Sequence, residues 1–198
     1  MNAPAIPRGE TRRRMAVGIS GASGFIYGLR LLEILRELDI ETHVIVSRAG
    51  LLTMAYETDY KLSDIEARSD FLYRSDDVAA SISSGSFKTM GMIIAPCSMK
   101  TLAEIASGVT SGLISRAAEV TLKERRRLVL LAREAPLTQT HLQNMLTVTQ
   151  MGAIVSPPVP AFYAKPESLE DMVDHTLGRV LDMFDLDAGC VRRWVKAP

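Results

Sequence analysis

The sequence predicts a doubly wound α/β domain, in which a parallel β-sheet carries helices on both faces. Short apolar runs of strand length alternate with longer segments whose apolar residues recur at three- and four-residue spacing, as on the buried face of a helix. Several apolar runs also end in small polar residues. The run 92–95, followed by Ser98 and Thr101 and then by a helical pattern, shows this most clearly. A buried strand of this kind delivers a loop and a helix N-terminus to the ligand-binding edge of an open sheet, where an anion or a polar ring edge would suit the free N–H groups.

The first half of the chain alternates strands and helices in this way. The turn Gly21-Ala22-Ser23-Gly24 leads from the first strand into the first helix. Its glycines lack the spacing of the dinucleotide-binding fingerprint, which leaves a tight corner and a ligand cradle as equal alternatives. The second strand is β-branched at its centre and ends in Ser47. The expected strands are 15–20, 42–47 and 71–73, and the expected helices are 26–35, 51–57 and 62–67; the loop 82–87 follows.

The second half continues the alternation. Arg133 and Glu134 follow a buried strand directly, and charges placed there need partners because their desolvation is costly. Glu170 and Asp171 lie in the first turn of the closing helix, as in a capped helix. The expected strands are 92–95, 128–132 and 152–156, and the expected helices are 102–108, 113–126, 138–151 and 168–184, with 96–101 read as a loop.

Length and composition fit one domain at 15–198 after a disordered tail at 1–14. Lys plus Arg and Asp plus Glu both number 23, so the overall charge points neither to nucleic acid nor to a membrane surface. Cys97 and Cys190 are too few for a disulfide framework and favour a reducing, cytoplasmic location. Cys97 is interpreted as a buried structural thiol. No apolar run has the length of a bilayer span.

Several common types of catalytic and binding site are not expected, because the sequence lacks the residues that they require. His43, His141 and His175 are far apart and have no cysteine or carboxylate at ligand spacing, so no metal site is expected. The chain has neither a phosphate-binding loop ending in Lys-Ser or Lys-Thr nor a Gly-x-Ser-x-Gly elbow. The pair Asp76-Asp77 lacks the spaced partners that hold magnesium on a diphosphate.

Motifs in one order from Met15 to Trp194 resemble the UbiX family of flavin prenyltransferases. They are Gly21-Ala22-Ser23-Gly24, Pro96-Cys97-Ser98-Met99-Lys100-Thr101, residues 116–124, Leu128-Val129-Leu130 with residues 133–137, Asn144-Met145 and Pro160-Ala161-Phe162-Tyr163. The resemblance implies a Rossmann-like flavoprotein fold and transfer of a dimethylallyl group from dimethylallyl phosphate to reduced FMN, without a metal. It further implies that the prenylated FMN serves a UbiD-type decarboxylase, and that the protein is a homo-oligomer, commonly a dodecamer, with sites at subunit contacts. Whether the donor is a mono- or a diphosphate stays open.

The resemblance also assigns site residues. FMN is expected at Gly21, Ala22, Ser23, Ser47, Ser98, Met99, Lys100, Thr101 and Arg133, and the donor at Arg116, Lys123, Tyr163 and Arg179. Ser23, Glu57, Lys123, Glu134 and Trp194 match residues around the reacting centre. This assignment is chemically consistent: fixed cations neutralise a leaving phosphate, an aromatic face stabilises an allylic cation, and a carboxylate such as Glu134 can carry a proton.

Bland interpretations compete with some of these roles. Tyr163 and Trp194 are also explained as packing residues, and Glu57 as a residue that caps or solvates its helix. Arg116 and Lys123, seven residues apart on one helix face, are more commonly a solvated basic stripe. Two other functions compete as well: a flavin-dependent cysteine decarboxylase, which would need a histidine base after the first helix, and a non-catalytic flavin-binding subunit of an aromatic acid decarboxylase. Glu57 and the pair Arg116 and Lys123 favour prenyl transfer.

Overall fold

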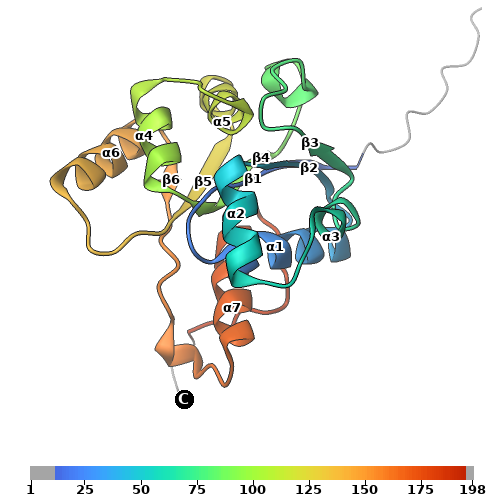
Figure 1. The fold of residues 1–198 in the computed structure, drawn as a ribbon. Coiled ribbons are helices and arrows are strands. Elements are labelled where there is room, and N and C mark those ends of the chain that lie inside the picture. Colours follow the sequence, from blue (N-terminus) through green and yellow to red (C-terminus); the bar gives the residue numbers. More distant parts are fainter. Residues whose placement is uncertain (1–11, 195–198) are drawn as a thin grey trace, which may run out of the picture.

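The computed structural model describes residues 12–194, so most of the predicted tail lies outside the described residues (Figure 1). The strands are β1 (Arg14–Ile19), β2 (Glu41–Val46), β3 (Phe71–Tyr73), β4 (Gly91–Cys97), β5 (Arg127–Ala132) and β6 (Ile154–Val155). The α-helices are α1 (Phe25–Glu37), α2 (Arg48–Glu57), α3 (Leu62–Glu66), α4 (Met99–Ser107), α5 (Leu113–Lys123), α6 (Gln139–Gln150) and α7 (Leu169–Asp182). Two short 3₁₀ helices, η1 (Ser81–Ser83) and η2 (Phe162–Ala164), complete the described elements.

All strand pairs are parallel, and the sheet order is β3-β2-β1-β4-β5-β6. The predicted doubly wound fold is confirmed. The chain builds outward from β1 in one direction and from β4 in the other, so the strand order reverses between these two neighbours. Ligands of open α/β sheets bind outside the carboxyl ends of the strands at such a switch point.

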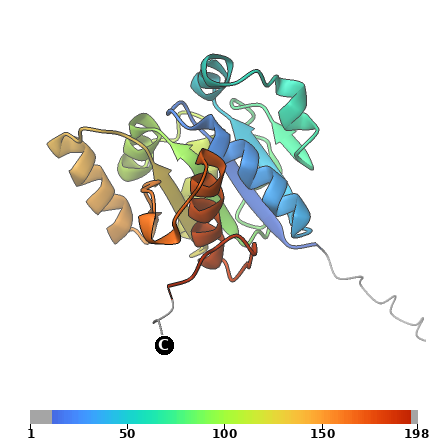
Figure 2. The ribbon, with the colours of Figure 1, turned by 90° about the horizontal axis from the view of Figure 1, so that it is seen from below.

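Helices cover both faces of the sheet, and two separate hydrophobic clusters fill the space between. Alternate residues of each strand point to opposite faces. On β1, Val17 packs on the face covered by α1 and α7, whereas Ala16 packs on the face covered by α4 and α5. Figure 1 places these two groups of helices on opposite sides of the sheet, and Figure 2 shows α1 and α7 next to each other. Because both faces are covered, the loops at the carboxyl edge are the part of the sheet open to a ligand.

Four of the described helices begin at a serine or threonine that caps the helix N-terminus. The side-chain oxygens of Ser47, Ser98, Thr138 and Ser168 each accept a hydrogen bond from the N–H three residues further on, which caps α2, α4, α6 and α7. None of the helices between residues 12 and 194 combines the length and apolarity needed to cross a bilayer.

Several predicted boundaries are wrong: α4 begins at Met99, inside the predicted loop 96–101, and α2 begins at Arg48 rather than at residue 51. Three further differences have a cause that the structure shows. β1 begins at Arg14, and Arg12 forms ion pairs with Asp39 and Asp70, so residues 12–14 belong to the folded part rather than to a tail. β4 continues through Pro96 to Cys97, because a register shift against β5 after Ile94 accommodates a residue without an N–H. α5 ends at Lys123 instead of residue 126, because Arg125 turns into the left-handed region with φ of 57°.

Candidate functional site

The loops that follow β1, β4 and β5 meet at the switch point and line a cavity of about 260 Å³. We call this the switch-point cavity. The polar groups around it include the Ser23 and Ser98 side chains, the Arg133 guanidinium and the Glu134 carboxylate. Its lining residues are Gly21, Ala22, Ser23, Ser98, Met99, Arg133 and Glu134, all of which are among the predicted site residues.

A second cavity of about 250 Å³ adjoins the first, with which it shares Gly21 and Ser98. We call it the helix-terminus cavity, because the N-termini of α2, α4 and α5 all contribute to its lining. Ser47, Lys100 and Thr101, three more of the predicted flavin residues, lie here. Helix N-termini present N–H groups and the positive end of the helix dipole, which favour an anion such as a phosphate, although the carboxylates of Asp76 and Glu104 also line this cavity.

Ser20, which is not among the predicted site residues, joins the ends of the two central strands next to these cavities. Its side chain is buried, and Oγ donates to the carbonyl oxygen of Pro96 at 2.9 Å while accepting from the N–H of Ser98 at 2.7 Å. The backbone N–H of Ser20 also donates to Pro96, at 3.1 Å. The Ser20 hydroxyl, at the end of β1, therefore fixes the position of the Ser98 backbone. The sequence does carry a signal for this role, because Ser20 is a polar residue at the end of the first apolar run, just as Ser47 is at the end of the second.

Glu57 ties the loop 21–24 to the C-terminal end of α2. Its carboxylate accepts from the backbone N–H groups of Gly24 and Phe25, both at 2.9 Å, and so caps α1. Burial alone would raise the pKa of Glu57, but the interaction with Ser23, the two N–H groups and the nearby Arg133 charge outweigh it and hold the pKa below its ordinary value. Arg133 Nε donates to the carbonyl oxygen of Ser23 at 3.2 Å. The result is an ionised carboxylate beside the switch-point cavity.

Cys97 lies directly before Ser98 but takes no part in this chemistry. The side chain is fully buried, and burial raises the pKa of the thiol to about 12. The prediction that the Cys97 thiol is buried is confirmed, and both cysteines are free.

The predicted donor residues do not gather at this edge within one chain. Each of the three cations forms an ion pair with a near neighbour: Arg116 with Glu119 at 2.7 Å, Lys123 with Glu124 at 2.6 Å, and Arg179 with Asp182 at 2.7 Å. None of them lines the switch-point or the helix-terminus cavity. Lys123 instead borders a third cavity of about 310 Å³, which shares Glu104 and Ser115 with the helix-terminus cavity.

Tyr163 and Trp194 lie together elsewhere. Their rings meet edge to face with centroids 5.5 Å apart, and Tyr163 meets His175 in the same way at 5.7 Å. Trp194 is 78% exposed. His175 is buried, and its Nε2 has no hydrogen-bond partner in the described part of the chain. Tyr163, predicted to bind the donor phosphate, and Trp194, predicted near the prenyl group, are therefore neighbours, and neither lines the two cavities that hold the predicted flavin residues.

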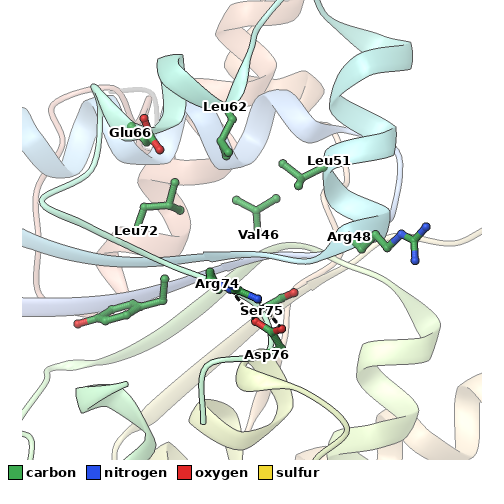
Figure 3. Close-up of a pocket in the computed structure, with 10 residues that line it drawn as sticks. Val46, Arg48, Leu51, Leu62, Glu66, Leu72, Arg74, Ser75 and Asp76 are labelled. Atoms are coloured by element: carbon green, nitrogen blue, oxygen red, sulfur yellow. Dashed lines mark hydrogen bonds and ion pairs between the residues drawn. The ribbon is translucent and has the colours of Figure 1, made fainter. Parts of the chain in front are cut away.

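A further cavity of about 380 Å³ lies between α2, α3 and β3 (Figure 3). Val46, Leu51, Leu62 and Leu72 form its apolar part, and the ion pair between Arg74 and Asp76 lies at its rim. It shares Arg48, Ser75 and Asp76 with the helix-terminus cavity, but no predicted site residue lines it. Over residues 12–194, no three histidine, cysteine or acidic side chains are grouped as a metal site would require.

Comparison with known proteins gives consistent matches over nearly the whole chain. The family model described as Flavoprotein matches residues 5–181. The chain is 54% identical over 173 residues to flavin prenyltransferase UbiX of Escherichia coli K12, covering 87% of this chain and 92% of the relative. It is 50% identical over 187 residues to a probable UbiX-like flavin prenyltransferase of Bacillus subtilis, covering 94% and 92%.

Solved structures agree. The crystal structure of AnUbiX (PadA1) in complex with FMN and dimethylallyl pyrophosphate has a TM-score of 0.93 and 53% identity, covering 95% of this chain and all of that one. A dodecameric FMN-dependent UbiX-like decarboxylase from Escherichia coli O157:H7 has a TM-score of 0.90 and 49% identity, covering 92% and 99%. Peptidyl-cysteine decarboxylase EpiD, at 13% identity and a TM-score of 0.62, shares the fold alone.

Proposed function

This chain belongs to the UbiX family and is a flavin prenyltransferase, and we propose that it transfers a dimethylallyl group from dimethylallyl phosphate to reduced FMN. The observation that carries this proposal is the pair of adjoining cavities at the switch point, which share Gly21 and Ser98. One offers N–H groups to a phosphate, and the other offers hydroxyl and guanidinium groups to a polar ring.

The hydrogen-bonding groups that line the two cavities suit FMN. We propose that the phosphate lies in the helix-terminus cavity near Ser47 and residues 98–101, and that the flavin ring lies in the switch-point cavity near residues 21–23 and Arg133. Bound reduced FMN supplies the nucleophilic ring to which the dimethylallyl group is joined. The ionised Glu57 fixes the loop 21–24 around that ring through the N–H groups of Gly24 and Phe25.

Arg116, Lys123, Tyr163 and Arg179 are proposed to bind the donor phosphate in an assembly of several copies. Their side chains are partly or largely exposed, and the E. coli O157:H7 relative is dodecameric. We propose a homo-oligomer in which these cations and the Tyr163 hydroxyl reach a neighbour's flavin site. Fixed charges would then neutralise the leaving phosphate without a metal ion, through charge-assisted hydrogen bonds.

Two residues are proposed at the reacting centre. Glu134 lines the switch-point cavity and would move a proton beside the leaving phosphate. Trp194 presents an exposed π face to the allylic group, which suits a centre that develops positive charge. We further propose that a UbiD-type decarboxylase receives the prenylated FMN and that the reaction takes place in the cytoplasm.

Mass measurement of the flavin tests the proposed reaction. The protein is incubated with reduced FMN and either dimethylallyl phosphate or the diphosphate, and the flavin is expected to gain one dimethylallyl group with the monophosphate. If only the diphosphate gives product, the donor is the diphosphate rather than the monophosphate. If neither changes the flavin mass, prenyl transfer is refuted and a non-catalytic flavin-binding subunit is favoured. Release of CO₂ from a peptidyl cysteine would favour the decarboxylase instead.

Glu134→Gln tests the proton transfer. The variant is expected to bind FMN as the wild type does but to form prenylated flavin more slowly, by about 10²-fold or more, in single turnover. An unchanged single-turnover rate would remove this role.

Lys123→Ala tests the phosphate contact. Loss of one charge-assisted bond is expected to weaken binding of dimethylallyl phosphate by roughly tenfold or more, with FMN affinity nearly unchanged. Equal losses for both ligands would count against a clamp specific to the donor.

A further inference from the structure

The end of α5 gathers four charged residues, Lys123 to Arg126, around one turn of chain. The N–H of Arg125 donates to Leu122 and the N–H of Arg126 donates to Thr121, both at 2.9 Å, and Arg125 takes the left-handed conformation. This is the Schellman pattern of a helix C-terminus. The turn brings the Arg126 side chain back toward the same surface that carries Lys123 and Glu124.

Arg126 binds the loop that precedes β4. Its Nη1 donates to the carbonyl oxygen of Phe87 at 2.7 Å and its Nη2 donates to that of Gly85 at 2.6 Å. One planar guanidinium therefore fixes two carbonyl groups of this loop, a geometry that an ammonium group cannot reproduce. The far end of the loop is also held, since the Phe87 ring packs edge-on against the buried His43 and under the Arg14 guanidinium.

Gly85, fixed in this way, lies directly against the Lys123–Glu124 ion pair. A methyl group on Gly85 would lie 2.7 Å from Lys123 Nζ and would overlap the Glu124 carboxylate. A side chain at residue 85 would therefore displace the ion pair from this position. The Lys123 ammonium pairs with Glu124 at 2.6 Å in the space that a side chain at residue 85 would occupy.

We propose that Arg126 is a positioning residue for the prenyl donor: it fixes the backbone of Gly85, and Gly85 in turn sets where the Lys123 ammonium stands. This inference rests on the proposed function, in which Lys123 binds the phosphate of dimethylallyl phosphate. Arg126 itself is committed to two carbonyl groups and acts only through Lys123.

Steady-state kinetics of the full-length chain test it. Arg126→Lys keeps the charge but loses the paired bonds, and it is expected to raise KM for dimethylallyl phosphate about tenfold, while the Kd for reduced FMN changes by less than about twofold. Gly85→Ala is expected to raise the same KM by displacing the ion pair. Arg125→Lys is the matched control, because the Arg125 side chain forms neither a hydrogen bond nor an ion pair in the described range 12–194.

A double-mutant cycle separates this role from a general effect on folding. If Arg126 acts through Lys123, then Arg126→Lys has no further effect on KM in a Lys123→Ala background. An equal rise of KM in both backgrounds overturns the proposal, as does an unchanged KM in Arg126→Lys and Gly85→Ala. Should Arg126→Lys fail to fold, Gly85→Ala with and without Lys123→Ala decides by the same criteria. A wild-type protein that forms no prenylated flavin would instead refute the proposed function, and this inference with it.

Discussion

Replacing Ser20 with alanine removes the hydroxyl that joins the ends of β1 and β4 at the switch point. The wild-type Oγ makes two bonds, to Pro96 at 2.9 Å and from Ser98 at 2.7 Å, and the side chain is 1% exposed. Alanine fills nearly the same volume, so the main change is a Ser98 N–H that loses its partner. An unsatisfied buried polar group costs about 1–3 kcal/mol, and because the bond to the Ser98 N–H is only partly buried we expect the free energy of unfolding to fall by about 1.5 kcal/mol.

The same substitution should weaken FMN binding. Ser98 borders both cavities and caps α4, so a shift of its backbone disturbs the N–H groups proposed to meet the flavin phosphate. If about 1.4 kcal/mol of the perturbation acts on that site, the Kd for FMN rises roughly tenfold.

Urea denaturation of the FMN-free protein at one protomer concentration measures the first effect, and quenching of flavin fluorescence on titration measures the second. Ser107→Ala is the control, because the Ser107 hydroxyl donates to the Ala103 carbonyl at 2.8 Å on the exposed end of the same helix. The control should stay within about 0.5 kcal/mol of the wild type. If Ser20→Ala matches the control in stability, the hydroxyl does not hold the strands; if stability falls while FMN affinity is unchanged, Ser98 does not depend on it.

Three further substitutions test other features. Glu57→Gln should be less stable than the wild type at neutral pH. Because the pKa of Glu57 is lowered in the folded state, its carboxylate stabilises the fold above a pH of about 4.5, and this stabilisation is lost as the pH falls through the folded-state pKa. Thermal unfolding scans should therefore show the difference between variant and wild type shrinking in acid, and a constant difference would contradict the assignment. Arg125→Gly should raise the free energy of unfolding by about 0.5–1 kcal/mol, because glycine takes the left-handed conformation without strain, and a loss measured in urea would oppose this. Gly21→Ala should weaken FMN binding, because the new methyl would overlap Ala49 across the cavity floor, and an unchanged Kd would show that the loops yield.

The sequence predicts the fold well where one physical signal dominates. The buried strands are short apolar runs, the helices carry apolar residues at helical spacing, and Ser47 and Ser98 cap the helices that follow them, so each element type can be read locally. Errors arise where a neighbouring element decides. β4 continues past Pro96 because β5 offers a shifted register, and that partner lies more than thirty residues further along the chain.

The site residues, too, divide into those that local sequence predicts and those that depend on a distant element. Ser23, Ser98 and Arg133 follow strands and reach one cavity because parallel strands share an edge. The contact of Glu57 with Gly24 spans 33 residues and depends on the angle between α1 and α2, which no local pattern encodes. Exposed cations are the hardest case, since Arg116, Lys123 and Arg179 look alike whether they are solvated, paired or shared with another subunit.

The division between the two halves of the proposed site has a functional consequence. The flavin half is made of backbone groups and side chains of one chain, held by Ser20 and Glu57. The donor half is spread over α5, η2 and α7, with its cations in local ion pairs. If subunits complete the donor half, then dilution into isolated chains should weaken binding of dimethylallyl phosphate before it weakens binding of FMN, because only the first requires a neighbour. Parallel titrations of both ligands across the dissociation range would show this order, and simultaneous loss would place both halves at the subunit contact.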